Sequence, residues 1–268
     1  MQGARDKFQE LGLGLAAVSY DNAEILADFS QRHGITYPLI ADPASDLIRK
    51  YDVLNAEATG FTKGMALPGY FFVTPDGTIK EKFFETAYTD RHTANSLLLS
   101  LFPQLVEGEG REIAAPYLKL TLLQSDNVVA PGSRFTVTAE VELPADTHVY
   151  SPDVKGYIPV ALVMEDTPGF ELQKQSFPKA ETLFLPAINE RVPVFTGRFR
   201  IHQQVVVASD RAFRSSLGDG KVLRLNGVFH YQACNKTTCF RPQEARVSWD
   251  FKVIGLNTQR SPNAIRHK

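Results

Sequence analysis

Cys234 and Cys239, in the stretch YQACNKTTCF, are the only two cysteines among the 268 residues, and four residues separate them. A cysteine pair can serve as a structural disulfide, as part of a metal site, or as a redox centre that exchanges electrons with another protein. Because the chain has no other thiol, any thiol chemistry must use this pair.

The residues before the pair alternate in polarity, as expected for a strand with one buried face. In VLRLNGVFHYQAC, the apolar Leu225, Phe229 and Tyr231 share one parity, and Cys234 falls with the polar set. This pattern predicts an accessible Cys234. Residues 235–238 suit a four-residue hairpin loop, which would place Cys234 opposite Cys239 within disulfide reach.

Stability and redox roles both remain open from the residues alone. Closing so short a loop contributes only about 2 kcal/mol on the chain-entropy model, and an accessible disulfide is easy for a thiolate to attack. A metal site is disfavoured. His230 would add only a third ligand where structural zinc uses four, and it lies about 13 Å from Cys234 along a strand rising ~3.3 Å per residue.

The chain that positions the two cysteines has two regions, which differ in their pattern of strand-like and helix-like segments. Residues 1–102 alternate strand-like and helix-like segments in the order β-α-β-α-β-β-α, which predicts an α/β domain. Asn22 and Gly34 bound a helix at 23–33, and GYFFVTPDGTIKEKFFE reads as a hairpin turning at Pro75-Asp76-Gly77. The chain starts with amphipathic spacing and no preceding helix cap, which predicts an N-terminally incomplete domain.

The second region consists of strands and turns. Residues 103–116 read as a linker, residues 117–255 as an antiparallel β-sandwich, and residues 256–268 as a polar tail. The clearest alternation lies in RFTVTAEVEL (134–143) and ARVSWDFKV (245–253).

Composition narrows the function classes. The net charge of −1 gives no electrostatic basis for binding nucleic acid or an anionic membrane. No apolar run is long enough to cross a bilayer, and no signal peptide is visible. The six histidines lack metal-site spacing and no phosphate loop is present, so no cofactor is expected.

Residues 117–254 resemble the N-terminal periplasmic domain of the thiol:disulfide interchange protein DsbD. The resemblance is carried by HVYSP, LPAINERVPVFTGRFRI and, most specifically, YQACNKTTCFRPQEARV. It implies an immunoglobulin-like fold in which Cys234 and Cys239 exchange electrons between a membrane donor and thioredoxin-like proteins outside the cytoplasm. The family shields its cysteines with an aromatic cap loop. Tyr157 is a candidate for this cap, and a turn tyrosine that packs on the sandwich is the alternative.

Residues 1–102 resemble the redoxin group, the alkyl hydroperoxide reductase/thiol-specific antioxidant proteins of thioredoxin fold. The matching stretches are LGLGLAAVSYDNAEILADFSQRHGITYPLIADP and ALPGYFFVTPDG. The resemblance implies that Pro68 is the cis-proline that borders the redoxin active site. However, residues 1–230 contain no cysteine, and a peroxidase needs a reactive thiolate. We therefore expect this domain to be chemically silent.

Three hypotheses follow. The first is thiol–disulfide exchange through Cys234 and Cys239. The second is a binding or scaffold protein with a structural disulfide. The third is a peroxiredoxin-type antioxidant enzyme whose N-terminal cysteine segment is missing. The residues do not assign the attacking sulfur, the direction of electron flow or the physiological partner.

Overall fold

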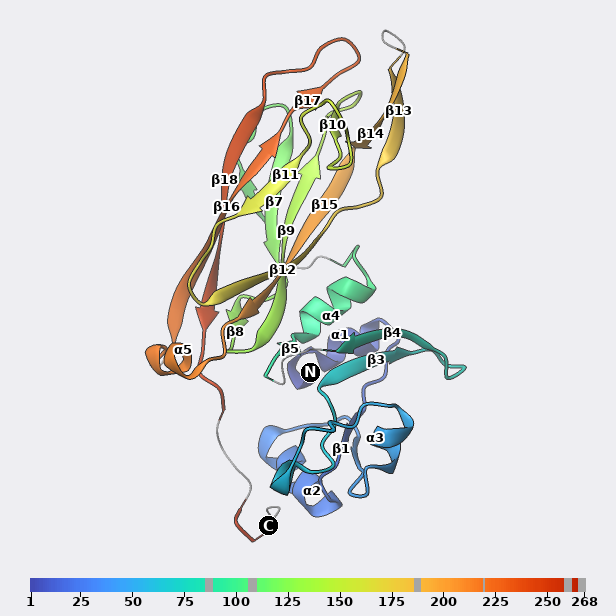
Figure 1. Ribbon diagram of the computed structural model, residues 1–268, viewed down its shortest axis with the longest axis vertical. Coiled ribbons are helices and arrows are strands. Elements are labelled where there is room, and N and C mark those ends of the chain that lie inside the picture. The colour runs from blue at the N-terminus through green and yellow to red at the C-terminus, as the bar shows by residue number, and fades with distance from the viewer. Residues whose placement is uncertain (85–88, 106–109, 186–188, 219, 258–261, 265–268) are drawn as a thin grey trace. The chain divides into compact units, whose positions relative to one another are not determined.

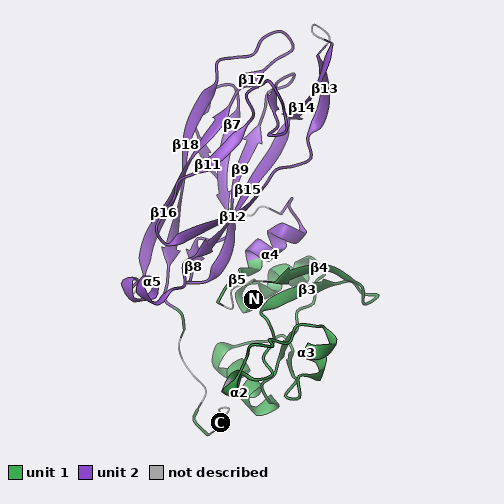
Figure 2. Cartoon of the chain, viewed as in Figure 1, with its two compact units in different colours: residues 1–94, 256–268 green, residues 95–255 purple. Residues whose placement is uncertain are grey.

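The computed structural model describes residues 1–84, 89–105, 110–185, 189–218, 220–257 and 262–264 (Figure 1). The chain divides into two compact units (Figure 2). Unit 1 comprises residues 1–94 and 256–268, and unit 2 comprises residues 95–255. The predicted domain boundaries at 102, 116 and 255 stay predictions, and parts of the linker (106–109) and of the tail (258–261 and 265–268) lie outside the described residues.

Unit 1 has the alternating order that the sequence predicts. Its elements are η1 (Gln2–Ala4), α1 (Arg5–Glu10), β1 (Ala17–Ser19), α2 (Ala23–His33), β2 (Leu39–Ala41), α3 (Asp46–Lys50), η2 (Gly60–Thr62), β3 (Gly69–Val73), β4 (Ile79–Phe84) and β5 (Arg91–His92). Strands β1 and β2 pair in parallel with α2 between them, and β3 pairs antiparallel with β4.

Helix α2 begins and ends where its capping residues predict. The Asn22 side chain accepts a hydrogen bond from the Ile25 N–H at 2.9 Å, which satisfies one of the free donors of the first turn. Gly34 ends the helix in the left-handed conformation, at φ 60°, where a side chain would be strained. Ile25 and Leu26 are the buried residues of the helix.

The predicted hairpin of unit 1 is confirmed over residues 69–84. The Thr74 N–H donates to the Thr78 carbonyl at 2.9 Å, and the Gly77 N–H donates to the Thr74 carbonyl at 2.8 Å. Gly77 has φ 84°, which explains why the turn requires glycine. A register shift between Phe72 and Val73 places a bulge beside the turn.

The prediction of a cis bond before Pro68 is wrong, because the described residues contain no cis peptide. Pro68 is buried directly before β3. The preceding Leu67 donates its N–H to the Val53 carbonyl at 2.7 Å, and Leu54 bridges Ala66. These contacts hold the segment extended with the trans bond, which is the lower-energy isomer of an X–Pro peptide.

Unit 2 is mostly β-sheet. It contains α4 (Ala94–Leu101, of which Asn95 onward belongs to this unit), β6 (Arg111–Ile113), β7 (Lys119–Gln124), β8 (Val128–Val129), β9 (Ser133–Glu142), β10 (His148–Tyr150), β11 (Ala161–Met164), β12 (Phe170–Ser176), β13 (Glu181–Leu185), β14 (Glu190–Thr196), β15 (Arg198–Val207), α5 (Arg211–Ser216), β16 (Lys221–Tyr231), β17 (Ala233–Cys234) and β18 (Gln243–Val253).

Unit 2 also contains helix α5 and most of helix α4. Helix α5 interrupts a region predicted to hold only strands and turns, and its N-terminus is capped by Asp210, which accepts from the Phe213 N–H at 2.9 Å. Helix α4 was predicted to close the first domain. From Asn95 onward it lies in the compact unit 2, where the Ser96 and Thr136 hydroxyls lie 3.0 Å apart in a buried contact, and the predicted boundary at 102 stays a prediction.

Two sheets of unit 2 share one hydrophobic core. Their strand orders are β12-β15-β9-β7-β6 and β11-β16-β18-β8. Alternate residues of β9 and β18 point into the core, including Phe135, Val137, Trp249 and Phe251, each at most 3% exposed. The alternation read from 134–143 and 245–253 therefore marks the buried faces correctly.

A third sheet, with the order β13-β14-β10-β17, carries the cysteine pair. In Figure 1 its strands gather at the end of unit 2 opposite α5. One face contributes Val149, Phe195 and Ala233 to the main core. The other face carries a smaller buried cluster of Tyr150, Val192, Val194 and Cys234.

Candidate functional site

Cys234 and Cys239 form a disulfide across a tight hairpin, as predicted. The two residues form an antiparallel bridge with their Cα atoms 4.0 Å apart. The Asn235 N–H donates to the Thr238 carbonyl at 2.9 Å, which closes the four-residue loop. The Asn235 side chain also accepts from the N–H groups of Thr237 and Thr238 at 2.9 and 2.8 Å, which fixes the turn.

The prediction that Cys234 is accessible is wrong, since this residue is 1% exposed. The prediction that Cys234 lies on the face of the polar set is correct, because Cys234 points away from the main core that contains Ala233. That second face is itself covered by Tyr150, Val192 and Val194. Strand β16 ends at Tyr231, and after Gln232 the chain enters β17, which pairs with β10 in the third sheet. Cys239, in contrast, is exposed.

Tyr150 contacts the exposed half of the disulfide. Its hydroxyl lies 3.8 Å from Sγ of Cys239, although the tyrosine is only 2% exposed. Burial raises the pKa of Tyr150 above its usual value, and the charge of Glu190 adds to this effect. The neutral phenol is therefore favoured beside the sulfur. Tyr150 was not predicted as a site residue, and its only signal in the sequence is its place in the HVYSP motif.

Tyr157 lies against Tyr150, in the loop between β10 and β11. Their rings stack with centroids 4.5 Å apart, and the Tyr157 hydroxyl donates to Glu190 Oε2 at 2.7 Å. This hydrogen bond, with smaller contributions from desolvation and charge, raises the pKa of Tyr157 to about 12. Tyr157 is thus one ring removed from the Cys239 sulfur, in the region where a cap residue was expected.

His148 faces the buried half of the disulfide. It is the cross-strand partner of Cys234 in the β10–β17 pair and is 5% exposed. Its Nε2 atom has no hydrogen-bond partner in the part of the chain that the structure describes. Burial lowers the pKa of the His148 imidazole, which favours its neutral form. In the sequence, His148 is one of six histidines, and no local pattern distinguishes it from the others.

A second set of contacts holds the strand that returns from the loop. Tyr117 and Phe240 stack with centroids 4.1 Å apart and an interplanar angle of 6°. Gln232 Nε2 donates to the Phe240 carbonyl at 2.9 Å, and the Phe240 N–H donates to the Ala233 carbonyl at 2.9 Å. The residue directly after Cys239 is therefore fixed on both sides.

His230, weighed in the sequence as a third metal ligand, lies on β16 and pairs with Glu244 at 3.2 Å from Nδ1. Within the described ranges, no group of three or more His, Cys, Asp or Glu side chains is arranged to hold a metal ion. None of the helices in these described residues is long and apolar enough to cross a membrane.

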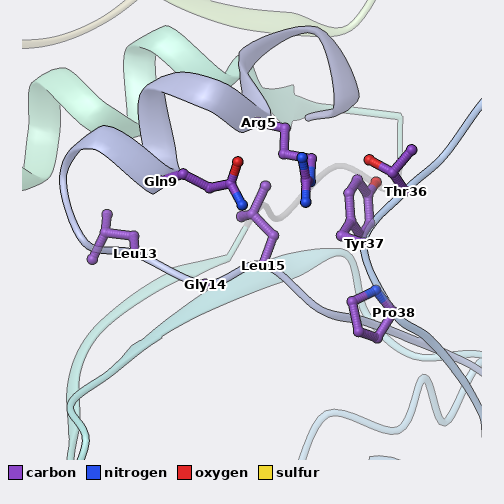
Figure 3. A pocket seen from close by; sticks show the side chains of 8 residues that line it. All are labelled: Arg5, Gln9, Leu13, Gly14, Leu15, Thr36, Tyr37 and Pro38. Atoms are coloured by element: carbon purple, nitrogen blue, oxygen red, sulfur yellow. The ribbon is translucent and has the colours of Figure 1, made fainter.

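A cavity in unit 1 has no thiol in its wall. It has a volume of about 210 Å³ and lies between the first helix and the segment before β2 (Figure 3). Its lining residues are Arg5, Gln9, Leu13, Gly14, Leu15, Thr36, Tyr37 and Pro38. Burial raises the pKa of Tyr37. None of these side chains provides the thiolate that peroxidase chemistry requires.

Together, these observations define a chain in which an α/β unit without cysteine precedes a mostly β-sheet unit with a hairpin disulfide. Residues 1–82 match the family described as AhpC/TSA, and residues 119–250 match the family described as thiol:disulfide interchange protein DsbD, N-terminal. Both resemblances read from the sequence are thereby confirmed. Residues 186–188 of the LPAINERVPVFTGRFRI stretch lie outside the described residues.

Individual relatives resemble separate parts of the chain. Alkyl hydroperoxide reductase C of Staphylococcus saprophyticus is 34% identical over 84 residues, which are 30% of this chain and 42% of that protein. The chain thus spans about two fifths of the length of the curated relatives it matches. A solved DsbD N-terminal domain from Neisseria meningitidis, in reduced form, is 14% identical with a TM-score of 0.30, covering 52% of this chain and 86% of that one.

A second solved structure from Neisseria meningitidis is a complex between the DsbD N-terminal and PilB N-terminal domains. The matched chain is 15% identical with a TM-score of 0.26, covering 44% of this chain and 73% of that one.

Proposed function

We propose that this chain carries out thiol–disulfide exchange, passing electrons between thioredoxin-like partners through Cys234 and Cys239. The observation that carries the proposal is the unequal exposure of the two joined residues: Cys239 is exposed and Cys234 is 1% exposed. A disulfide with one accessible end offers a partner thiolate a single sulfur to attack. The match of residues 119–250 to the DsbD N-terminal family supports the same reading.

The exposure assigns an order to the exchange. A partner thiolate attacks Sγ of Cys239, the bond between Cys239 and Cys234 breaks, and the electron pair leaves on Sγ of Cys234. A second thiolate of the partner then attacks the partner's first sulfur, which is bonded to Cys239 in the mixed disulfide. Cys239 leaves as a thiolate, the partner is oxidised to a disulfide, and the cysteine pair is reduced by two electrons.

The surroundings fit this chemistry. Tyr150 places a neutral hydroxyl 3.8 Å from the attacked sulfur, where it can donate a hydrogen bond to a developing thiolate. Tyr157, stacked on Tyr150, is proposed as the cap that limits access to the disulfide. No cofactor is invoked, because the electrons travel as thiols.

We further propose thioredoxin-like proteins or a membrane electron donor as partners, in the periplasm or another extracytoplasmic compartment. Disulfides persist in oxidising compartments, which supports this location. We also propose that unit 2 is an immunoglobulin-like sandwich, because its two larger sheets bury one common core.

The match of residues 1–82 to the AhpC/TSA family fits the peroxiredoxin-type alternative. However, residues 1–230 contain no cysteine, so we do not propose peroxidase activity for these 268 residues.

The test is a redox titration of the pair in glutathione and thioredoxin buffers. We expect a reduction potential above about −300 mV, the value below which structural disulfides usually lie. A disulfide that stays oxidised throughout these buffers would make the pair structural and support the scaffold alternative.

A matched pair of variants tests the assigned order. Cys234→Ser keeps the exposed thiol and Cys239→Ser keeps the buried one. After each is labelled with thionitrobenzoate, a thioredoxin without its resolving cysteine should displace the label rapidly from Cys239 and slowly from Cys234. Equal rates would contradict the assignment of Cys239 as the attacked residue.

A further inference from the structure

Strand β10 (His148–Tyr150) presents one side chain to each half of the disulfide. His148 and Tyr150 are two residues apart and therefore point to the same face of the sheet. Tyr150 reaches Sγ of Cys239 at 3.8 Å. His148 lies directly opposite Cys234 in the antiparallel register. The tyrosine thus contacts the exposed sulfur, and the histidine lies opposite the buried cysteine.

The environment of His148 calls for an explanation. Side chains directly opposite one another in an antiparallel pair have Cβ atoms about 4.5–5.5 Å apart, close enough to interact. His148 is 5% exposed, and its Nε2 atom finds no hydrogen-bond partner among the described residues. Leaving a buried polar atom unpaired costs about 1–3 kcal/mol. A buried, unpaired nitrogen beside a disulfide therefore points to a partner that exists only in another state of the protein.

We infer that His148 is the acid–base partner of the Cys234 sulfur, receiving a hydrogen-bond partner when the disulfide is reduced. This inference rests on the proposed function, because it assigns a role in the same exchange. The chemistry is that of a cysteine–histidine pair, in which the imidazole exchanges a proton with the thiol.

The proton step completes the exchange. When the partner thiolate bonds to Cys239, Cys234 leaves as a thiolate at a residue that is only 1% exposed, whereas the neighbouring His148 is 5% exposed. His148 takes a proton from solvent and transfers it to this sulfur, so one proton enters for each disulfide bond broken at this step. In the reverse direction, His148 accepts the proton of the Cys234 thiol while the thiolate attacks the mixed disulfide and expels the partner sulfur.

The other groups around His148 do not supply this proton in the described structure. Tyr150 shares its face, with ring centroids 5.4 Å apart, but its hydroxyl contacts Cys239. On β14 the cross-strand neighbour is Thr196, which donates to Glu181 on β13. Two further charged groups are engaged in pairs: Glu190 with Tyr157, and Lys236 with Asp146.

The first experiment measures the pKa of the Cys234 thiol in the full chain carrying Cys239→Ser, from thiolate absorbance at 240 nm. Adding His148→Phe keeps an aromatic ring beside Tyr150 but removes the imidazole. We expect the thiol pKa to rise by about one unit or more, a tenfold loss of thiolate at a given pH. The control is His202→Gln, a half-buried histidine of unit 2 on β15, which should leave this pKa unchanged. An unchanged pKa with His148→Phe would overturn the inference.

The second experiment separates proton exchange from packing and needs no change at His148. The His148 imidazole is titrated by nitrogen NMR in the Cys239→Ser chain and in the chain with both cysteines replaced by serine. Coupling between two sites is reciprocal, so the imidazole should hold its proton to a higher pH in the chain that retains the Cys234 thiolate than in the chain with both cysteines replaced. Equal imidazole titrations in the two chains would overturn the inference.

The outcome of these two measurements is independent of whether the proposed function is correct. A pair that resists glutathione buffers but shows the reciprocal pKa change would refute redox exchange and keep the His148–Cys234 coupling. A pair that titrates without this coupling would do the reverse.

Discussion

The Tyr157 ring stacks on the Tyr150 ring with centroids 4.5 Å apart, and the Tyr150 hydroxyl contacts Sγ of Cys239. Glu190 anchors the outer ring through a 2.7 Å hydrogen bond to its hydroxyl. Tyr157 also packs against the buried cluster of Tyr150, Val192, Val194 and Cys234. The proposed cap therefore lies directly beside the residue that contacts the exposed sulfur.

Replacing Tyr157 with alanine should accelerate reduction of the disulfide. An aromatic pair contributes about 0.5–1.5 kcal/mol, so removing the outer ring should raise the rate with dithiothreitol about three- to tenfold. Stopped-flow measurement of thiol release would show this. Tyr157→Phe is the matched control, because it keeps the stacked ring and loses only the hydrogen bond to Glu190. A rate unchanged by Tyr157→Ala would remove Tyr157 as a cap and leave it as a packing residue.

The elements of this chain that the sequence predicted depend on neighbouring residues. Asn22 and Gly34 bound helix α2, Gly77 permits the turn of the unit 1 hairpin, and Asn235 closes the disulfide loop. Each of these effects acts within a few residues of its own position. Strand alternation was equally local, which is why the buried faces of β9 and β18 were predicted correctly.

The features that the sequence did not predict depend on distant residues. Cys234 has the parity of an outward-facing residue, but Tyr150 and Val192, from other strands, cover that face. No local pattern marks His148 as the neighbour of Cys234, because the register of β10 against β17 is set by the whole sheet.

His202 should make the stability of the protein depend on pH. Burial, with the charge of Arg200, lowers its pKa to about 4, and Thr138 Oγ1 lies 2.9 Å from its Nδ1. The unfolded state, with a histidine pKa near 6.5, binds the proton first. The contribution of neutral His202 to the free energy of unfolding is therefore complete above pH about 6.5 and is lost as the pH falls toward about 4. Urea unfolding across this range should show the fall, and His202→Gln should flatten it. A pH dependence identical in both proteins would contradict the assignment.

The 268-residue chain should not reduce hydroperoxides. Its only sulfur nucleophiles are Cys234 and Cys239, which are joined in unit 2, and the described cavity of unit 1 has no cysteine in its wall. Peroxide consumption in the presence of dithiothreitol measures this directly. The chain with both cysteines replaced by serine gives the background rate. Peroxide consumption well above that background would show that the hairpin thiols act as peroxidatic residues and would support the antioxidant alternative.

Reducing the disulfide should leave the fold of unit 2 standing. The hairpin loop is short, so the bond contributes about 2 kcal/mol to the free energy of unfolding on the chain-entropy model. The main core is built from other residues, including Phe135, Phe229 and Phe251, all 0% exposed. Far-ultraviolet circular dichroism should therefore be the same before and after reduction. Urea unfolding of the reduced protein, and of a chain with Cys234→Ala and Cys239→Ala, should show a loss near that value. Unfolding on reduction would mean that the bond is needed for structure. A carrier that loses its fold with its disulfide cannot complete a cycle of exchange, so this result would contradict the proposed function.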